Sequence, residues 1–354
     1  MNQVQFVQGI LPQLSAEQIA GTSSLLADGA TLPFIARYRK EKTGGLDELE
    51  IDAVSKACQK FQKLVDRKAT ILKAIEEQDG LSQSLAQKIA DCWDESELED
   101  IYLPFKRKKT TKASKARTLG LEGLAKQIMA QNAQDIEALA ERFVNREVAT
   151  VSDALDGASH IIQEWVGENV ALRSTLRKWM EQYAELVTKI AKGKEEAAEN
   201  YKAHVGLKIK LKNCPTHRFM AIFRAYNEGV FQITFQLDEV RVKDLLARFY
   251  LKNHSNNKEW IERVLWQAYK KVLHPSLQTE TFNAKKQEAD LQSIKIFADN
   301  LEQLLMSPPL GKKRVLAIDP GFRTGCKVVC LDEQGTPLTN TTIFPHPPQN
   351  DKSA

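Results

Sequence analysis

The strongest concentration of positive charge without any carboxylate lies between residues 106 and 117. This basic segment carries no carboxylate, and its seven cations are Lys106, Arg107, Lys108, Lys109, Lys112, Lys115 and Arg117. Threonine and serine stand between them. Lysine and arginine neutralise backbone phosphates, and hydroxyl groups add neutral hydrogen bonds. The segment therefore predicts contacts with RNA or DNA that are largely independent of sequence and weaken as salt rises.

An acidic cluster directly before the basic segment offers an alternative explanation. Its members are Asp94, Glu95, Glu97, Glu99 and Asp100. The whole chain has a net charge of +4, whereas the basic segment alone carries seven positive charges. Positive and negative charges are therefore segregated along the sequence. In this alternative the basic segment is a solvated loop whose cations pair with these carboxylates. Such surface ion pairs contribute only about 0–1 kcal/mol to stability.

A second group of cations follows the sequence Leu32-Pro33-Phe34. The candidate nucleic-acid contacts here are Arg37, Arg39 and Lys40. Helices predicted over 16–28 and 33–41 would form a helix-turn-helix in which Arg37 and Lys40 share one face of the second helix. A DNA-binding version would place that helix in the major groove. The same geometry serves in structural bundles, and nearby carboxylates favour a structural or protein-contact role.

Asp319 is the candidate catalytic residue. It ends the apolar run 315–318, and a nuclease of the two-metal type needs several carboxylates around such a position. The other acids after residue 311 fall in a predicted turn and in the tail, so we expect Asp319 to cap the glycine turn. The sequence predicts no catalytic, metal or cofactor site in this chain.

Two enzymatic alternatives remain open from these residues. In one, Asp319 belongs to a metal-dependent, resolvase-type nuclease whose other carboxylates lie beyond residue 354. In the other, residues 319–325 form the first phosphate loop of an actin-like or sugar-kinase-like ATPase, which also uses a strand, an aspartate and a glycine turn.

The elements that must position these residues are predicted to be mostly helices. Apolar residues recur at three- and four-residue steps over 49–75, 84–93, 96–103, 120–131, 135–143, 152–166, 169–190, 216–226, 239–251, 257–273 and 276–306. Ser15 with Gln18 predicts a capping box, and Asp47 and Ser152 are predicted helix caps. We expect a loop or hinge over 193–213 and a strand over 230–235.

The pattern changes at Lys312. Three short apolar runs separated by glycine turns predict a β-meander over the last forty residues. Three strands without a covering helix do not make a stable sheet layer, so we expect the chain to be cut inside this domain. The predicted domains are a helical region over 1–310 and the start of an α/β domain over 311–354. The long helix over 276–306 is expected to pack on the N-terminal helices, because Ile294, Phe297 and Leu301 need a partner.

Composition excludes several classes of protein. Hydrophobic residues make up 42% and charged residues 27%, as in soluble globular proteins. No apolar run approaches the roughly 18–20 residues that span a bilayer, and the N-terminus lacks the pattern of a secretory signal. The five cysteines are scattered without a C-x-x-C pair. We therefore expect reduced thiols, a cytoplasmic location and no membrane partner.

Several sequence blocks together resemble the bacterial Tex (transcription accessory) family. They are Leu32-Pro-Phe-Ile-Ala-Arg-Tyr-Arg-Lys40, Thr43-Gly44, Leu46-Asp-Glu48, Leu103-Pro-Phe-Lys106, Pro215-Thr-His-Arg218 and Arg314-Val-Leu-Ala-Ile-Asp-Pro-Gly-Phe-Arg-Thr-Gly325. The resemblance implies a mainly α fold: a multi-helix region with helix-turn-helix-like elements and a long connecting helix. The first strands of a truncated YqgF domain, of RNase H-like α/β fold, would follow. Complete members would continue into helix-hairpin-helix modules and an OB-fold RNA-binding domain.

The functional expectation combines the basic segment with this resemblance. It is a non-catalytic, nucleic-acid-associated transcription accessory scaffold that binds RNA or DNA. RNA polymerase or ribosome-associated proteins are the expected protein partners. A pure protein-interaction module, with the basic segment docking an acidic partner, is the third alternative.

Overall fold

Helices account for most of the chain, which confirms the predicted mainly α fold. The computed structural model describes residues 1–78, 80–106, 110–132, 135–252, 257–321, 324–347 and 350–351. Contacts divide the chain into two units, Met1–Gln287 and Glu288–Ala354. The long helix α17 (His274–Leu305) runs through this division.

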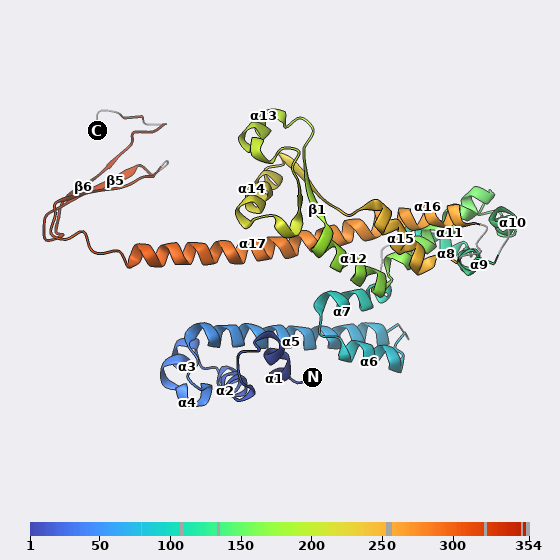
Figure 1. Ribbon diagram of the computed structural model, residues 1–354, viewed down its shortest axis with the longest axis horizontal. Coiled ribbons are helices and arrows are strands. Elements are labelled where there is room, and N and C mark those ends of the chain that lie inside the picture. Colours follow the sequence, from blue (N-terminus) through green and yellow to red (C-terminus); the bar gives the residue numbers. More distant parts are fainter. Residues whose placement is uncertain are drawn as a thin grey trace. The chain divides into compact units, whose positions relative to one another are not determined.

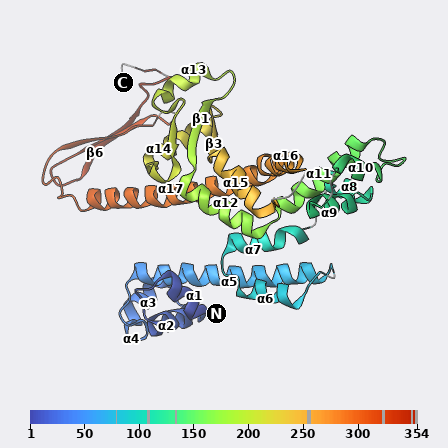
Figure 2. The same cartoon turned by 45° about the vertical axis from the view of Figure 1, so that its right-hand side comes forward.

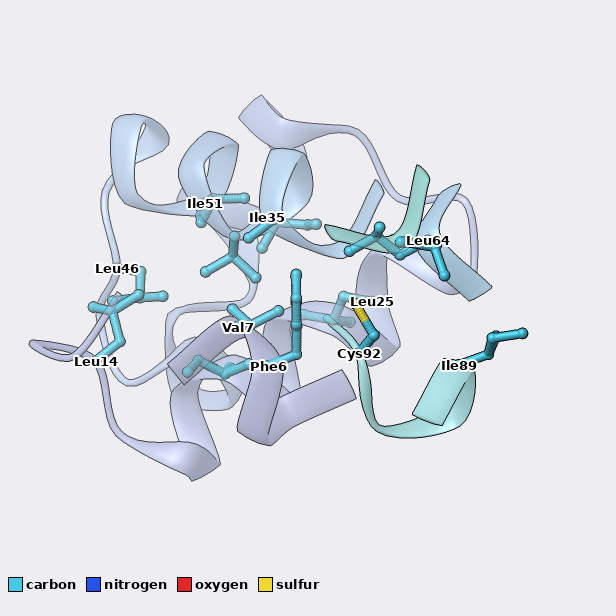
Figure 3. Close-up of a cluster of buried hydrophobic side chains, with 14 of the residues drawn as sticks. Phe6, Val7, Leu14, Leu25, Ile35, Leu46, Ile51, Leu64, Ile89 and Cys92 are labelled. Atoms are coloured by element: carbon cyan, nitrogen blue, oxygen red, sulfur yellow. The ribbon is translucent and has the colours of Figure 1, made fainter. Parts of the chain in front are cut away.

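The N-terminal helices build their core against one long helix. Helices α1 (Gln3–Ile10), α2 (Ala16–Ala27), α3 (Leu32–Tyr38) and α4 (Lys40–Thr43) gather at one end of α5 (Glu48–Glu76), as Figure 1 shows. Figure 3 shows apolar side chains from these helices, such as Val7, Ile35 and Ile51, meeting in one cluster. Burying each such side chain contributes about 1.5–3 kcal/mol.

Two helix caps predicted from the sequence are present in the N-terminal helices. The Ser15 hydroxyl accepts the backbone N–H of Gln18 at 3.2 Å, and the Gln18 side chain accepts the Ser15 N–H at 2.9 Å, which confirms the predicted capping box. Asp47 caps α5 in the same way, at 2.8 Å from the N–H of Glu50. Each cap satisfies a backbone donor that the first helical turn leaves open.

The predicted helix over 33–41 is wrong in one respect. The chain leaves helical geometry at Arg39 (φ −132°, ψ 28°), so Lys40 opens a separate helix and does not share a helical face with Arg37. The break turns α4 onto α2 at Gly21. A Cβ on Gly21 would lie 2.0 Å from the carbonyl oxygen of Lys42, so only glycine allows this close approach.

The middle of the chain is organised around α11 (Val151–Gly167). Helices α8 (Lys112–Thr118), α9 (Glu122–Ala130), α10 (Ile136–Glu141) and α16 (Lys258–Ala268) pack on it. Its cap is Thr150 and not the predicted Ser152, because the Thr150 hydroxyl accepts the N–H of Asp153 at 3.1 Å. Helices α6 (Gln83–Asp91) and α7 (Glu95–Tyr102) and the 3₁₀ turn Leu103–Phe105 connect α5 to this group.

A three-stranded antiparallel sheet corrects two predictions. Helix α12 (Val170–Tyr183) does not continue to residue 190, because β1 (Glu185–Ile190) pairs there with β2 (Lys208–Lys210) and β3 (Phe231–Gln236). The expected loop over 193–213 holds α13 (Glu195–Ala198), two 3₁₀ turns (Glu199–His204 and Leu211–Asn213) and β2. Helix α14 (Thr216–Asn227) packs beside this sheet (Figure 2). The predicted strand over 230–235 is confirmed as β3.

A buried ionic network joins three helices of the first unit. Arg173 on α12 donates to Asp100 on α7 at 2.5 Å and to Glu280 on α17 at 2.7 Å. Arg177 donates to the same two carboxylates, at 2.8 and 3.0 Å. The side chains of Arg173 and Asp100 are only 4% exposed, so the network fixes the start of α17 within the protein interior. Helix α15 (Glu239–Tyr250) and the π-helical turn Tyr269–Leu273 complete this part of the chain.

The second unit begins within α17 and ends in the predicted β-meander. Strands β4 (Val315–Asp319), β5 (Cys326–Leu331) and β6 (Pro337–Ile343) pair antiparallel in the order β4-β5-β6. Five apolar positions of α17 within this unit are exposed: Ile294, Phe297, Leu301, Leu304 and Leu305. The expected packing of this helix on the N-terminal helices stays a prediction. Among the described helices, none combines the length and hydropathy needed to cross a lipid bilayer.

Candidate nucleic-acid interface

The basic segment is helical in its second half. Lys106 is exposed, and Arg107, Lys108 and Lys109 lie outside the described residues. Helix α8 then begins with a capping box, in which the Thr111 hydroxyl accepts the Ser114 N–H at 3.0 Å and the Ser114 hydroxyl accepts the Thr111 N–H at 2.8 Å. Both hydroxyls are therefore engaged in capping the start of the helix and are not offered to a phosphate.

Helix α8 separates its cations by face. Ala113 and Ala116 are buried, which points Lys112 and Lys115 to the solvent. No carboxylate of the described residues pairs with either lysine. Arg117 differs, because its guanidinium donates to Glu164 of α11 at 2.6 Å and lies 3.7 Å from Glu122. Arg117 thus holds α8 on α11, and the two lysines supply the exposed positive charge.

Three carboxylates of the acidic cluster have partners elsewhere. Glu99 forms a bidentate pair with Arg67 at 2.6 and 3.0 Å, and Asp94 caps α7 through the N–H of Glu97. Asp100 lies in the buried network with Arg173. Because these three carboxylates have partners outside the basic segment, they argue against the alternative in which the acidic cluster neutralises that segment.

The imidazole of His160 on α11 lies close to Lys112 and Lys271. It lines a cavity of about 320 Å³ together with Lys112, Glu164 and Val272. Burial lowers the pKa of the His160 imidazole, and the positive charges of Lys112 and Lys271 lower it further, against the opposing effect of Asp156. A lowered histidine pKa beside lysines indicates a local positive potential.

The second predicted site forms an aromatic-basic surface on α3 and α4. It consists of Phe34, Arg37, Tyr38, Arg39, Lys40 and Lys42. Phe34 is 40% exposed and Tyr38 is 64% exposed, and their ring centroids lie 5.5 Å apart at an interplanar angle of 43°. The sequence pointed to the cations here and missed the two rings, whose four-residue spacing among cations was the available signal.

The cations of this surface are only weakly neutralised. The Arg39 guanidinium lies 5.1 Å from the centre of the Phe34 ring and donates to the Tyr38 carbonyl at 3.1 Å. Arg37 lies 3.9 Å from Glu48, and both side chains are more than half exposed. Such a pair contributes about 0–1 kcal/mol and leaves the guanidinium accessible.

A third basic face lies on α5 and was not predicted. Lys56, Lys60 and Lys63 line a groove of about 460 Å³ together with Gln59 and Arg67. Lys56 pairs with Asp52 at 2.6 Å. The spacing of these lysines at four and three residues along one helix was the signal in the sequence.

Asp319 ends β4 on the exposed surface. It stands opposite Lys327 of β5, and its carboxylate makes no hydrogen bond or ion pair with any described residue, so the predicted capping of the glycine turn is not observed. Phe322 and Arg323, in the turn of the phosphate-loop alternative, lie outside the described residues. Within the described residues, no group of three histidine, cysteine or acidic side chains is placed to hold a metal ion.

Sequence families match three stretches of the chain in order. The Tex-like protein N-terminal domain matches residues 1–76, the Tex central region-like family matches residues 131–297, and the Tex protein YqgF-like domain matches residues 313–354. The second match contains α11 and the ionic network residues Arg173 and Glu280. The third match contains the β-meander with Asp319.

Curated relatives are similar over almost the whole chain. Transcriptional accessory protein Tex of Neisseria gonorrhoeae is 36% identical over 94% of the chain, and Protein tex of Bordetella pertussis is 35% identical over 95%. The human S1 RNA-binding domain-containing protein 1 is 25% identical over 91%. The chain spans 45% of the length of each of the two bacterial relatives and 34% of the human one. From its first helices to the β-meander, the chain belongs to the Tex family.

Proposed function

We propose that this chain is a non-catalytic scaffold of the transcription machinery that binds RNA or DNA through backbone phosphates. The observation that carries the proposal is the exposed, unneutralised positive charge of Lys112 and Lys115 on α8, with Lys106 preceding them. The names of the bacterial relatives support the link to transcription, and the name of the human relative supports contact with RNA. A cytoplasmic location and partners such as RNA polymerase or ribosome-associated proteins belong to the same proposal.

The physical basis is the release of counterions. Each phosphate that a lysine neutralises releases condensed cations, so the logarithm of the binding constant falls with the logarithm of salt by about 0.9 for each contact with duplex DNA and about 0.7 for single strands. Three lysines therefore predict a slope that is shallower by about 2 to 3 when they are removed. The packing of α8 on α11 does not depend on them, because Arg117 and the buried alanines hold that helix.

The experiment is fluorescence anisotropy with labelled single- and double-stranded RNA and DNA between about 50 and 300 mM salt. Replacing Lys106, Lys112 and Lys115 with alanine is expected to weaken binding and to flatten the salt slope by about 2. The matched control replaces Lys189, Lys192 and Lys194, which are equally exposed, and so changes net charge by the same amount. Equal slopes for the two triple variants would show that α8 makes no specific contact.

The same proposal gives Asp319 no catalytic role. Its support is that no other candidate metal ligands gather around this carboxylate among the described residues. We expect labelled strands to stay intact with the chain in Mg²⁺ or Mn²⁺, for wild type and Asp319→Asn alike. Cleavage by the wild type that disappears in Asp319→Asn would establish Asp319 as a metal ligand and overturn the non-catalytic assignment.

A further inference from the structure

We propose that the aromatic-basic surface of α3 and α4 binds single-stranded nucleic acid by stacking unpaired bases on Phe34 and Tyr38. This inference rests on the proposed function, since it also requires that the chain bind nucleic acid. It adds a site separate from α8, a ligand class and a mode of contact.

The two rings are displayed by the fold. Ile35 and Ala36 of α3 are buried in the N-terminal core, and Pro33 lies in the first turn of the helix. Phe34 and Tyr38 therefore fall on the opposite face, four residues apart, where each retains a large exposed fraction. An aromatic ring in a well-packed protein is usually covered, so two neighbouring exposed rings mark a binding surface.

Charge on this surface selects an anionic partner. Residues 34–42 contain four cations and a single carboxylate, Glu41. Lys40 and Lys42 are exposed, and no carboxylate of the described residues pairs with them. Rings beside cations match a nucleotide, which offers a flat base next to a charged phosphate.

The rings favour a single strand over a duplex. In a duplex the faces of the bases are stacked on one another, so an aromatic side chain finds only edges and phosphates. An unpaired base offers its π-face, and every base has one, which makes stacking tolerant of sequence. The break at Arg39 also limits α3 to seven residues, about 10 Å, so the continuous face expected for a major-groove helix is absent from this segment.

The test compares labelled 12-nucleotide oligo-dT and oligo-U with a 12-base-pair duplex, using the full chain. Tyr38→Leu and Phe34→Ala are each expected to weaken single-strand binding by about 5- to 100-fold and to leave duplex binding unchanged. Tyr38→Phe keeps the ring and is expected to bind normally. The salt slope should not change in these variants, because they remove no charge.

The control variant is Tyr183→Ala. Tyr183 is 50% exposed and has the Arg241 guanidinium 5.9 Å from its ring, so it is a comparable exposed ring beside cations that lies outside the aromatic-basic surface. Its loss is expected to leave both affinities unchanged. Thermal unfolding confirms the fold of each variant, and Tyr38→Leu decides the outcome if Phe34→Ala unfolds. A strand carrying 5-iodouracil should also crosslink to Phe34 or Tyr38, as located by mass spectrometry.

The outcomes separate this inference from the proposed function. Single-strand binding that is insensitive to Tyr38→Leu but lost in the α8 triple variant would overturn the stacking site and leave the α8 contact standing. A glutamate-rich 12-residue peptide that binds with the same dependence on Tyr38 would identify a protein-docking surface and overturn the inference. Absence of binding to every nucleic acid would overturn both proposals.

Discussion

The imidazole of His160 lies beside the cations that define the α8 surface. Its pKa is lowered by burial and by Lys112 and Lys271, so the ring is neutral in the folded protein at pH 7. The unfolded chain titrates at the ordinary histidine pKa of about 6.5. As the pH falls below that value, the unfolded state binds a proton that the folded state does not. The free energy of unfolding therefore decreases as the pH falls from the histidine pKa of the unfolded chain to the lower pKa of His160 in the folded protein.

We expect His160→Gln to reduce the loss of unfolding free energy between pH 7 and pH 5. Urea denaturation of the wild type and the variant at both pH values measures the difference. NMR titration of the imidazole gives the folded pKa directly and should place it below about 6.5. An NMR pKa above that value would contradict the positive field assigned to this part of α11.

Single residues were predictable where their partners are close in sequence. The structure confirms the capping box of Ser15 with Gln18 and the cap at Asp47, whose partners lie three residues away. The partner of Arg117 is Glu164, 47 residues away, and no local pattern could identify it. The four-residue spacing of Phe34 and Tyr38 among cations was a local signal, but the exposure of the two rings is set by the tertiary structure.

The ionic network joins the first turns of α17 to α7 and α12. Removing one partner of a buried ion pair leaves an uncompensated charge and costs about 3–5 kcal/mol. In Asp100→Asn, both guanidinium groups would share Glu280 alone. We therefore expect this variant to lose about 3 kcal/mol of unfolding free energy, measured by urea denaturation with the m-value checked.

The matched control for this network is Asp52→Asn. Asp52 pairs with Lys56 at 2.6 Å on the exposed face of α5. Its removal should cost less than about 1 kcal/mol, because solvent screens the pair. Equal losses in the two variants would show that burial adds nothing to the Asp100 interactions.

Elements with a clear helical period were predictable, and those defined by distant pairing were not. The long helices α5 and α17 follow from their apolar spacing alone. Strand β1 was expected to be helix, because its identity comes from hydrogen bonds to β2 and β3, whose residues lie some 20 to 50 positions later. The local sequence is compatible with either structure until those partners are present.

On the scale of the whole molecule, the C-terminal half of α17 carries a run of exposed apolar side chains. Ile294, Phe297 and Leu304 are each more than 60% exposed, and they recur at three- and seven-residue steps. Contiguous exposed apolar surface of this kind binds apolar dyes and other proteins.

We expect the chain to bind the dye ANS, and replacing Ile294, Phe297, Leu301 and Leu304 with glutamine to remove most of that fluorescence. Glutamine retains helix propensity, so α17 should persist by circular dichroism. The control replaces Leu49 and Val240, which are exposed singly on α5 and α15. Fluorescence that falls equally in the control would assign the dye to scattered side chains instead.

The ionic network also has a consequence for the order in which the chain folds during synthesis. Asp100 must wait for Arg173, made 73 residues later, and Arg173 for Glu280, a further 107 residues on. At a translation rate of about 5–20 residues per second, Glu280 emerges roughly 10 to 40 s after Asp100. The N-terminal helices, whose core is contained within the first hundred residues or so, can close during that interval. The Asp100 carboxylate of α7 stays unpaired until α12 supplies Arg173 and Arg177, and the network is complete only when Glu280 of α17 has followed.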